Sequence, residues 1–451
     1  MNMSILAILS ALFGCFCIWR EIVLIVRRKQ IRISNLFFII YGLTYGIILA
    51  LLLVFYKTRK YQAIAQFLRF DYSYRGLRFS TCWFLAAIVG YLSCKFGTML
   101  RVHTDRNRKH LYAERMRGDQ RLLNRLQITS LLCMCIGIVC FFIWVEGWGG
   151  YSNLFLNAAA IRNGSYGIRN KVAFFAKPAQ IVATVSVISI YLLKREKNIL
   201  LNRALLVVSF LFSLLYYLAK DGRMAMAMYL LIVLFMTGGM FERQENIGGK
   251  FGRLAGLFLI FVFIVLNMTT LTSALRGRIQ ITSNDVSTLE SIMSELTYIY
   301  VAGQTSVKKC LIDGSPFLIG HDIGAALFAW VPSALTPKGL MNIWDYNTFL
   351  IAGNRATAQY PTDLISTSLY DLGVLGPILL PLFWGMIIGK LERMNIQNSS
   401  PIISILYYSL SMTLLRIVNY SMFSATVASV FHLFVAAVVY WGVTRIRLRI
   451  Y

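Results

Sequence analysis

The sequence predicts an all-α protein that crosses a membrane many times, with a long helical loop on one side. Of its 451 residues, 57% are hydrophobic and only 14% are charged, whereas soluble domains are about 45–50% apolar and about 25% charged. Several apolar runs reach about 20 residues, enough to cross a hydrocarbon core of roughly 30 Å. The runs are continuous, unlike the alternating strands of a barrel, and helices satisfy their own backbone in lipid.

Eleven apolar segments are expected to form the spanning helices. Because the first charges follow the first apolar run, we expect a retained span there and not a cleaved signal peptide. No repeat relates the two halves, and no low-complexity tract or appended soluble domain is visible, so residues 1–451 are expected to form one integral membrane domain. The expected spans are 3–25, 33–56, 80–100, 126–145, 172–193, 199–219, 224–240, 253–273, 372–390, 401–418 and 423–443.

Lys and Arg in the short loops predict the orientation of the chain. The densest basic block, residues 101–125, holds eight Lys or Arg against three acids, an excess that is typical of cytoplasmic loops. If this block is cytoplasmic, the N-terminus is outside and the C-terminus is inside. Positive-inside loops then explain most of the net charge of +26, so we expect no nucleic-acid partner. The clusters on the same side are 27–32, 194–198, 241–253, 390–393 and 445–449.

This topology leaves one long segment, residues 274–371, on the outer side. A connection of this length is usually functional or disordered, and its apolar and aromatic content argues against disorder. In "STLESIMSELTYIY", Ser287 and Glu290 have the spacing of a capping box and precede a helical apolar stripe, which predicts a helix. The run "IGAALFAWVP", 323–332, is too short to span and suits an interfacial or re-entrant helix.

Known catalytic and cofactor motifs are absent from the sequence. It contains no GxxxxGK phosphate loop, no HExxH, no GxSxG and no DxD carboxylate pair. The four His are scattered, and seven of the eight Cys lie in apolar runs, as small core residues do. We therefore expect neither a metal site nor a cofactor.

Arginines near the ends of the spans are the best candidates for an outer binding site. Burying a charge there costs free energy and calls for a reason, and the planar guanidinium matches phosphate oxygens. Simple solvation in a loop is the alternative for each of them. Several Arg that converge at the outer leaflet would suit a lipid pyrophosphate. The candidates are Arg162, Arg169, Arg223, Arg276, Arg278, Arg355 and Arg416.

Three residues of the long loop are the candidate catalytic acids and bases. His321 and Asp322, in "GHDIG", form the adjacent His–acid pair on the outer side, and a His with an ordinary pKa of about 6.5 can act as a base. The alternative is a solvated His beside an N-capping Asp. Glu295 lies on the capped helix. Asp363 and Asp371 are further carboxylates, with helix capping or loop hydrogen bonding as their alternative roles.

Several pieces of the chain together resemble the Wzy-type family, the bacterial inner-membrane polymerases of O-antigen or oligosaccharide repeat units. These pieces are the loop "GWGGYSNLFLNAAAIRNG", the span start "KDGRMAMAMYLL", the long outer loop between late spans, and "YPTDLISTSLYDLGVLGPILLPLFWGMIIGKLE". The resemblance covers most of the chain in architecture. The family diverges so far that the identity of the sugars does not transfer.

The resemblance implies a GT-C-like membrane glycosyltransferase, independent of metal and nucleotide sugars, with its site facing the periplasm. The donor would be the growing glycan on undecaprenyl pyrophosphate and the acceptor a lipid-linked repeat unit. Arg162 and Arg223 lie in the matched pieces and would bind the pyrophosphate, where charge develops as it leaves. The expected partners are undecaprenyl-pyrophosphate-linked oligosaccharides, membrane lipids and a chain-length regulator protein.

Two other functions remain open from the sequence. An O-antigen ligase uses the same donor and commonly has a catalytic His in a large outer loop, a role that His321 would fit. A lipid-linked oligosaccharide flippase or another transporter is the alternative from a different class. Transporters are usually built from repeated halves with a site near the midplane, and this sequence shows no such repeat.

Overall fold

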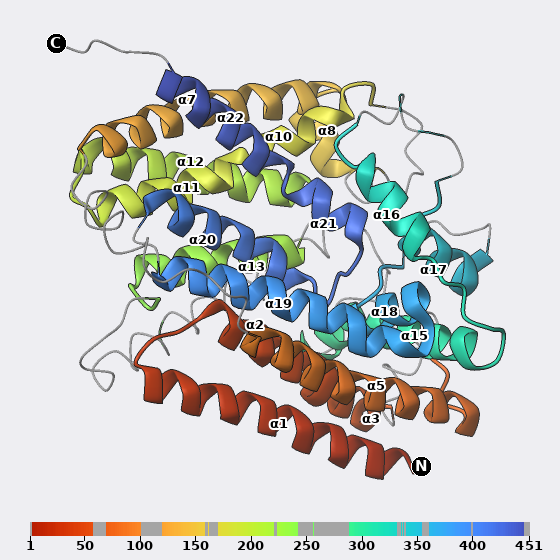
Figure 1. The fold of residues 1–451 in the computed structure, drawn as a ribbon. Helices are drawn as coiled ribbons and strands as arrows, with labels where there is room; N and C mark the ends of the chain where they lie inside the picture. Colours follow the sequence, from red (N-terminus) through yellow and green to blue (C-terminus); the bar gives the residue numbers. More distant parts are fainter. Residues whose placement is uncertain are drawn as a thin grey trace.

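The computed structural model describes residues 2–56, 69–100, 120–157, 161, 170–220, 223–241, 256, 288–331, 335, 337, 340–353, 360–397 and 400–445. Every regular element within these residues is a helix (Figure 1). Eight helical segments of this part are long and apolar enough to cross a membrane. The predicted class, an all-helical polytopic membrane protein, is therefore confirmed.

The eight membrane-spanning candidates agree with eight of the eleven predicted spans. Two further predicted spans are shorter helices: residues 224–240 form α13 (Arg223–Thr237) and residues 401–418 form α20 (Pro401–Arg416). The remaining prediction, 253–273, lies outside the described residues except for Gly256. The candidates are Met3–Arg28, Ile33–Phe55, Tyr74–Met99, Gln120–Glu146, Ala173–Leu193, Ile199–Ala219, Leu364–Ile396 and Phe423–Arg445.

Several of these segments consist of more than one helical element. The second membrane-spanning segment, Ile33–Phe55, contains a π-helical turn, η1. This turn lets Gly46 approach the backbone of Gly14 on the first helix. The elements in chain order are α1 (Met3–Arg28), α2 (Ile33–Gly42), η1 (Leu43–Ile48), α3 (Leu49–Phe55), α5 (Tyr74–Met99), α7 (Gln120–Glu146), α8 (Tyr151–Leu156), η2 (Ala173–Phe175), α10 (Ala176–Ala179), α11 (Ile181–Leu193), α12 (Ile199–Ala219), α13, α15 (Thr288–Leu311), α16 (Ile319–Leu327), α17 (Ile343–Ala352), α18 (Leu364–Leu372), η5 (Gly373–Leu375), α19 (Gly376–Gln397), α20, α21 (Phe423–Ser429) and α22 (Phe431–Arg445).

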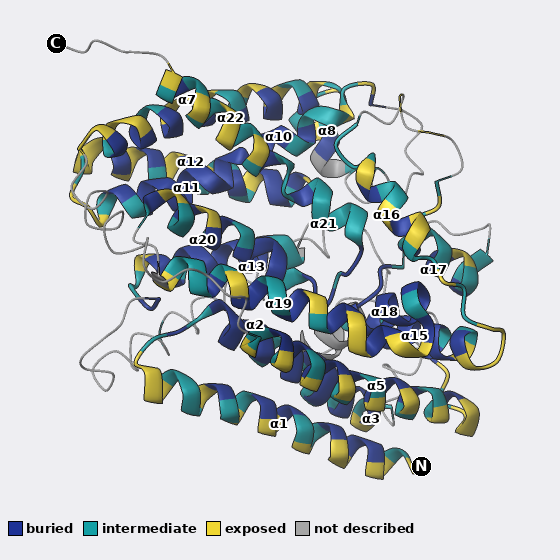
Figure 2. Ribbon diagram, in the orientation of Figure 1, coloured by how far each residue is buried: buried dark blue, intermediate teal, exposed yellow. Residues whose placement is uncertain are grey.

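The helices form a bundle in which burial separates a core from an apolar periphery. Figure 2 shows buried residues concentrated along α11, α13 and α18, whereas α1 alternates buried and exposed residues along its length. The exposed residues of α1 and α12 include Trp19, Leu12 and Leu200, each with more than half of its surface exposed. An apolar exterior of this kind suits lipid rather than water.

The two ends of the bundle carry different elements. Figure 1 places the start of α1 at the same end of the bundle as α16 and α17, and the end of α22 at the opposite end. The described part of the long predicted outer loop contains α15, α16, α17 and most of α18. The helix predicted from the capping box is confirmed as α15. The predicted short helix at 323–332 begins earlier, at Ile319, and ends at Leu327.

Glycines allow α5 and α19 to approach each other closely. A Cβ on Gly385 would lie 2.1 Å from the backbone oxygen of Cys94, and one on Gly97 would lie 2.4 Å from the oxygen of Leu382. Small residues allow this approach of two backbones, which provides the packing energy between helices in lipid.

We expect Gly385→Ala to destabilise the protein by about 1–3 kcal/mol, because the added methyl group must push two backbones apart. Gly442→Ala on α22 is the matched control, since a Cβ there meets no atom within 4 Å. Thermal unfolding of the two purified variants in detergent measures the difference. Equal melting temperatures would contradict the close approach of α5 and α19.

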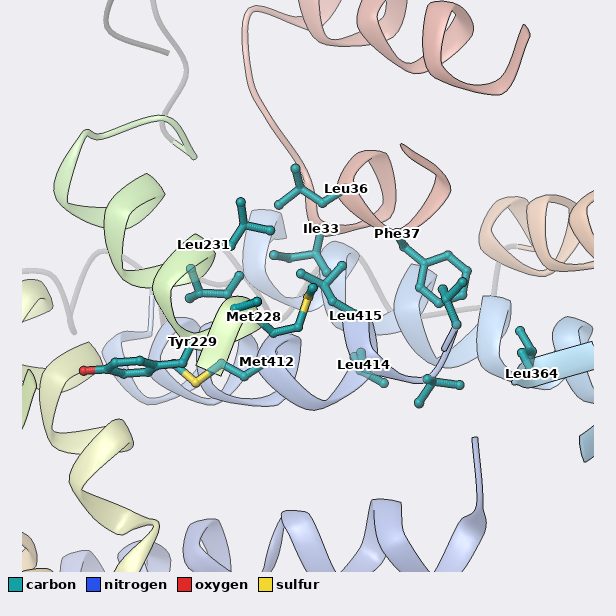
Figure 3. Close-up of a cluster of buried hydrophobic side chains, with 14 of the residues drawn as sticks. Ile33, Leu36, Phe37, Met228, Tyr229, Leu231, Leu364, Met412, Leu414 and Leu415 are labelled. Atoms are coloured by element: carbon teal, nitrogen blue, oxygen red, sulfur yellow. The ribbon is translucent and has the colours of Figure 1, made fainter. Parts of the chain in front are cut away.

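The start of α13 and the end of α20 are brought together by the apolar core. Figure 3 shows Met228 and Leu231 of α13 close to Met412 and Leu415 of α20, with Ile33 and Leu36 of α2 beside them. All of these side chains are buried. This packing positions the polar ends of both helices, which form the site described next.

Candidate anion-binding site

The structure describes only some of the residues that the sequence singled out. Arg162, Arg169, Arg276, Arg278 and Arg355 lie outside the described residues. Arg223 is the first residue of α13, and Glu295 lies in α15. The side chains of His321, Asp322 and Arg416 are described.

The end of α20 and the start of α13 meet at one place. The last residue of α20 is Arg416, and its backbone oxygen accepts hydrogen bonds from the N–H groups of Asn419 (3.0 Å) and Tyr420 (2.9 Å). The side-chain nitrogen Nδ2 of Asn419 lies 3.9 Å from Sδ of Met224, the second residue of α13. The N-terminus of α13 therefore lies beside the turn that follows Arg416, and unpaired N–H groups at a helix N-terminus favour an anion.

Two lysines join Arg416 in a cationic cluster. Lys220 follows α12 and lies within electrostatic range of Arg416. Lys177, at the start of the fifth candidate span, lies within electrostatic range of Lys220. We call Lys177, Lys220 and Arg416 the cationic cluster. Their three positions are far apart in sequence, and only the fold brings them together.

The cationic cluster has no carboxylate partner among the described residues. The ion pairs there are Lys95–Glu21 and Lys309–Asp313, neither of which involves the cluster. Arg416 is half-buried, and a cation away from bulk water costs free energy unless it is paired. An anion bound between these groups would offset that cost.

Hydroxyl groups and rings complete the surroundings of the cluster. The hydroxyls of Tyr216, Tyr217, Tyr298 and Tyr420 all lie within electrostatic range of Arg416. The Lys220 ammonium donates to the Tyr216 hydroxyl at 3.1 Å, and this hydroxyl donates to the oxygen of Ala176 at 2.8 Å. Aromatic and hydroxyl groups next to cations suit a ligand that carries both a charged group and sugar rings.

The charge of Lys220 depends on pH in the neutral-to-alkaline range. Its side chain as a whole is exposed, but its ammonium group, held at the Tyr216 hydroxyl, is surrounded by protein. Burial of this group, and next the positive charge of Arg416, lower the pKa of Lys220 to about 8. Lys220 is therefore mostly cationic at neutral pH and loses its charge as the pH rises through about 8.

Lys177 connects the cluster to the segment that follows α16. Its ammonium donates to the backbone oxygen of Ala329 at 2.8 Å and lies 3.5 Å from that of Val331. Between them, Trp330 donates to the oxygen of Val427 at 2.6 Å. These contacts hold the segment that follows α16 against Lys177 and the end of α21.

The structure separates His321 from Asp322. His321 is exposed on α16, whereas Asp322 is fully buried and its Oδ2 accepts a hydrogen bond from the N–H of Phe423 at 2.8 Å. Neighbouring residues of a helix point in different directions, about 100° apart. The sequence placed both residues in one acid–base pair, but Asp322 binds the start of α21 instead.

Asp363 is one of the two other carboxylates noted in the sequence. It has the alternative role given there, which is helix capping. It caps α18 by accepting hydrogen bonds from the N–H groups of Ile365 (2.9 Å) and Ser366 (3.1 Å), and it also accepts one from the Tyr45 hydroxyl (2.9 Å). A carboxylate bound by this many donors is a structural cap rather than a free base.

The binding candidates from the sequence were all arginines, so Lys177 and Lys220 were not among them, although Lys220 lies only three residues before Arg223 in "KDGRM". The tyrosines of α12 had no signal at all, because tyrosines are common in apolar spans.

Comparisons of the chain with protein-family models, with curated proteins and with solved structures find no match. The geometry and the chemistry of the site therefore carry the functional argument.

Proposed function

We propose that this protein is a GT-C-like membrane glycosyltransferase that polymerises lipid-linked oligosaccharide repeat units. It would act at the periplasmic face of a bacterial inner membrane and transfer the growing glycan from undecaprenyl pyrophosphate to the next lipid-linked unit. The observation that carries the proposal is the cationic cluster, which lies beside the N-terminus of α13 and has no carboxylate partner among the described residues. Such a site suits a diphosphate.

The proposed reaction uses this cluster to stabilise the leaving group. An acceptor hydroxyl attacks the anomeric carbon of the donor glycan, the bond from that carbon to the diphosphate oxygen breaks, and the hydroxyl proton leaves to a base. Negative charge develops on the diphosphate, and preorganised cations stabilise it most in a site of low dielectric constant. Arg416 and Lys220 would fill this role, with Arg162, Arg169, Arg223, Arg276, Arg278 and Arg355 as further candidates.

One observation favours an O-antigen ligase as the second candidate. His321 is exposed on α16, a helix of the outer segment, and a ligase would use such a His as its base. A polymerase and a ligase share the donor and therefore share the need for the cationic cluster. They differ in the acceptor, which is a lipid-linked repeat unit for the polymerase and a lipid A core for the ligase.

Deletion of the gene distinguishes the candidate functions. We expect surface polysaccharide with a single repeat unit in place of a ladder on a gel, because each unit is still exported and attached but not extended. Complete loss of attached chains would indicate a ligase. Loss of export with a build-up of cytoplasmic precursor would indicate a flippase, and an unchanged ladder would contradict all three functions.

A further inference from the structure

A groove beside the start of α5 combines two arginines with apolar walls. It lies between the first turns of α5 and the end of α15, and its volume is about 310 Å³. Pockets for small ligands start at about 300 Å³, so the groove suits a compact group such as the headgroup of a lipid. The residues that line it are Arg75, Arg78, Phe79, Cys82, Leu311 and Ile312.

The groove lies where a membrane-spanning helix begins. Arg75 and Arg78 are the second and fifth residues of the candidate span Tyr74–Met99, and Cys82 comes one turn further along it. Long cationic side chains at the end of a span extend to the interface, where the phosphate groups of the bilayer lie. The groove therefore changes from charged to apolar in the direction in which a lipid does.

The two arginines have no carboxylate partner among the described residues. The Arg75 guanidinium lies 5.9 Å from the centroid of the Phe79 ring, and the Arg78 guanidinium lies 5.5 Å from that of Tyr74. At these distances the rings attract the cations without using their N–H donors as a carboxylate would. The two ion pairs in this part of the chain involve neither arginine, so both guanidinium groups can bind an anion.

Gln304 of α15 fixes the two walls of the groove relative to each other. Its Nε2 donates to the backbone oxygen of Asp71 at 2.7 Å and to Oγ of Ser80 at 2.9 Å, and its Oε1 accepts from the N–H of Asp71 at 2.9 Å. The Asp71 carboxylate accepts from the N–H of Ser73 at 2.8 Å and does not line the groove. The two helices are thus joined before any ligand binds, which lowers the cost of binding.

An exposed apolar stripe continues from the groove along α5. Leu85, Val89, Leu92 and Phe96 follow Cys82 at intervals of three and four residues, which places them on one face of the helix. Each of the four has between 40% and 60% of its surface exposed. From Cys82 to Leu92 the helix rises about 15 Å, half of a hydrocarbon core of about 30 Å. This part of the stripe therefore matches the acyl chains of one leaflet.

We propose that the groove binds the headgroup of an anionic phospholipid, whose acyl chains lie along the stripe. The phosphate accepts hydrogen bonds from Arg75 and Arg78, because planar guanidinium groups match phosphate oxygens. An anionic headgroup fits better than a zwitterionic one, since the groove offers two cations and its lining includes no carboxylate for a headgroup cation. None of these residues belongs to the cationic cluster, so the proposal does not depend on glycan transfer.

Native mass spectrometry of the full-length protein in detergent, with added lipid, tests the proposal. We expect phosphatidylglycerol to bind more tightly than phosphatidylcholine with the same acyl chains. The double variant Arg75→Gln/Arg78→Gln should bind phosphatidylglycerol about 25-fold more weakly, since each basic residue at a membrane surface strengthens the binding of anionic lipid about fivefold. Its binding of phosphatidylcholine should stay close to that of the wild type.

Arg195→Gln/Arg445→Gln is the matched control for the loss of charge. These two arginines also lie over rings, at 5.7 Å from the centroid of Tyr191 and 5.0 Å from that of Trp441, and neither lines the groove. The control should bind phosphatidylglycerol as the wild type does. An equal loss of affinity in both double variants would overturn the proposal, because total charge and not the groove would then explain the binding.

Cys82→Trp tests the groove itself, because it fills the space and keeps both arginines. It should also weaken the binding of phosphatidylglycerol, whereas Cys135→Trp, at another exposed cysteine of a membrane-spanning helix, should not. Wild-type affinity in either Cys82→Trp or the arginine variant overturns the proposal. Displacement of phosphatidylglycerol by an equal concentration of polyprenyl diphosphate also overturns it, since the groove would then belong to the substrate. A wild-type dimer that Cys82→Trp dissociates overturns it as well, since a second copy would then fill the groove.

Discussion

The Arg416→Gln variant should lose glycan elongation by about 100-fold or more while remaining folded. A single charged or hydrogen-bonding group aimed at developing negative charge commonly contributes about 10²–10³ in rate. Arg416 is half-buried and has no carboxylate partner among the described residues, so removing its charge also removes a desolvation cost. The initial rate of elongation of a synthetic polyprenyl-diphosphate oligosaccharide, measured with purified protein, reports the loss.

Thermal unfolding of the same variant separates a binding role from a structural one. If Arg416 binds substrate, its Gln variant should unfold at the wild-type temperature or above it. Arg416→Lys should retain part of the activity, because it keeps the charge and loses the bidentate fork. A lower unfolding temperature together with normal elongation would show that Arg416 serves the fold rather than the reaction.

The Lys220→Arg variant should stay active at a pH where the wild type does not. With a pKa of about 8, about a tenth of wild-type Lys220 remains charged at pH 9, and kcat/KM reports the ionisation of the free enzyme. We therefore expect the wild-type kcat/KM to fall about tenfold between pH 7 and 9. Lys220→Arg should lack this fall, because Arg stays protonated throughout this range.

Two further variants make the Lys220 result interpretable. Lys220→Met should have low activity at every pH, because it removes the charge permanently. Lys309→Met removes a lysine of α15 that is paired with Asp313, and it should keep both the wild-type rate and the wild-type pH profile. If the wild type and Lys220→Arg decline in parallel above pH 8, the ionising group lies elsewhere.

Much of the fold could be predicted because apolar length is a local property. Eight predicted spans coincide with long apolar helices, and the capping box at Ser287 correctly indicated α15. α13 and α20 are harder cases, with 15 and 16 residues. At 1.5 Å per residue they reach only about 22–24 Å, less than a hydrocarbon core of about 30 Å, and their flanking apolar residues made them look longer.

The site could be predicted only in part, because it depends on contacts between distant segments. Arg416 was a candidate from its place at the end of an apolar run, but nothing in the sequence related it to Lys220 or to Lys177. The burial of Asp322 and Asp371 also has no local signal, since both stand in polar-looking loop sequence, "GHDIG" and "YDLG". The adjacent pair of His321 and Asp322 looked like a unit, and helical geometry turns the two side chains apart.

Purified wild-type protein in lipid vesicles, supplied with a polyprenyl-diphosphate-linked oligosaccharide repeat unit and a chelator, tests the central claim most directly. The account predicts glycans of two or more units on the lipid, with one polyprenyl diphosphate released for each bond formed, and neither product with Arg416→Gln. Release of polyprenyl diphosphate without longer glycans, or equal products from wild type and Arg416→Gln, would contradict it.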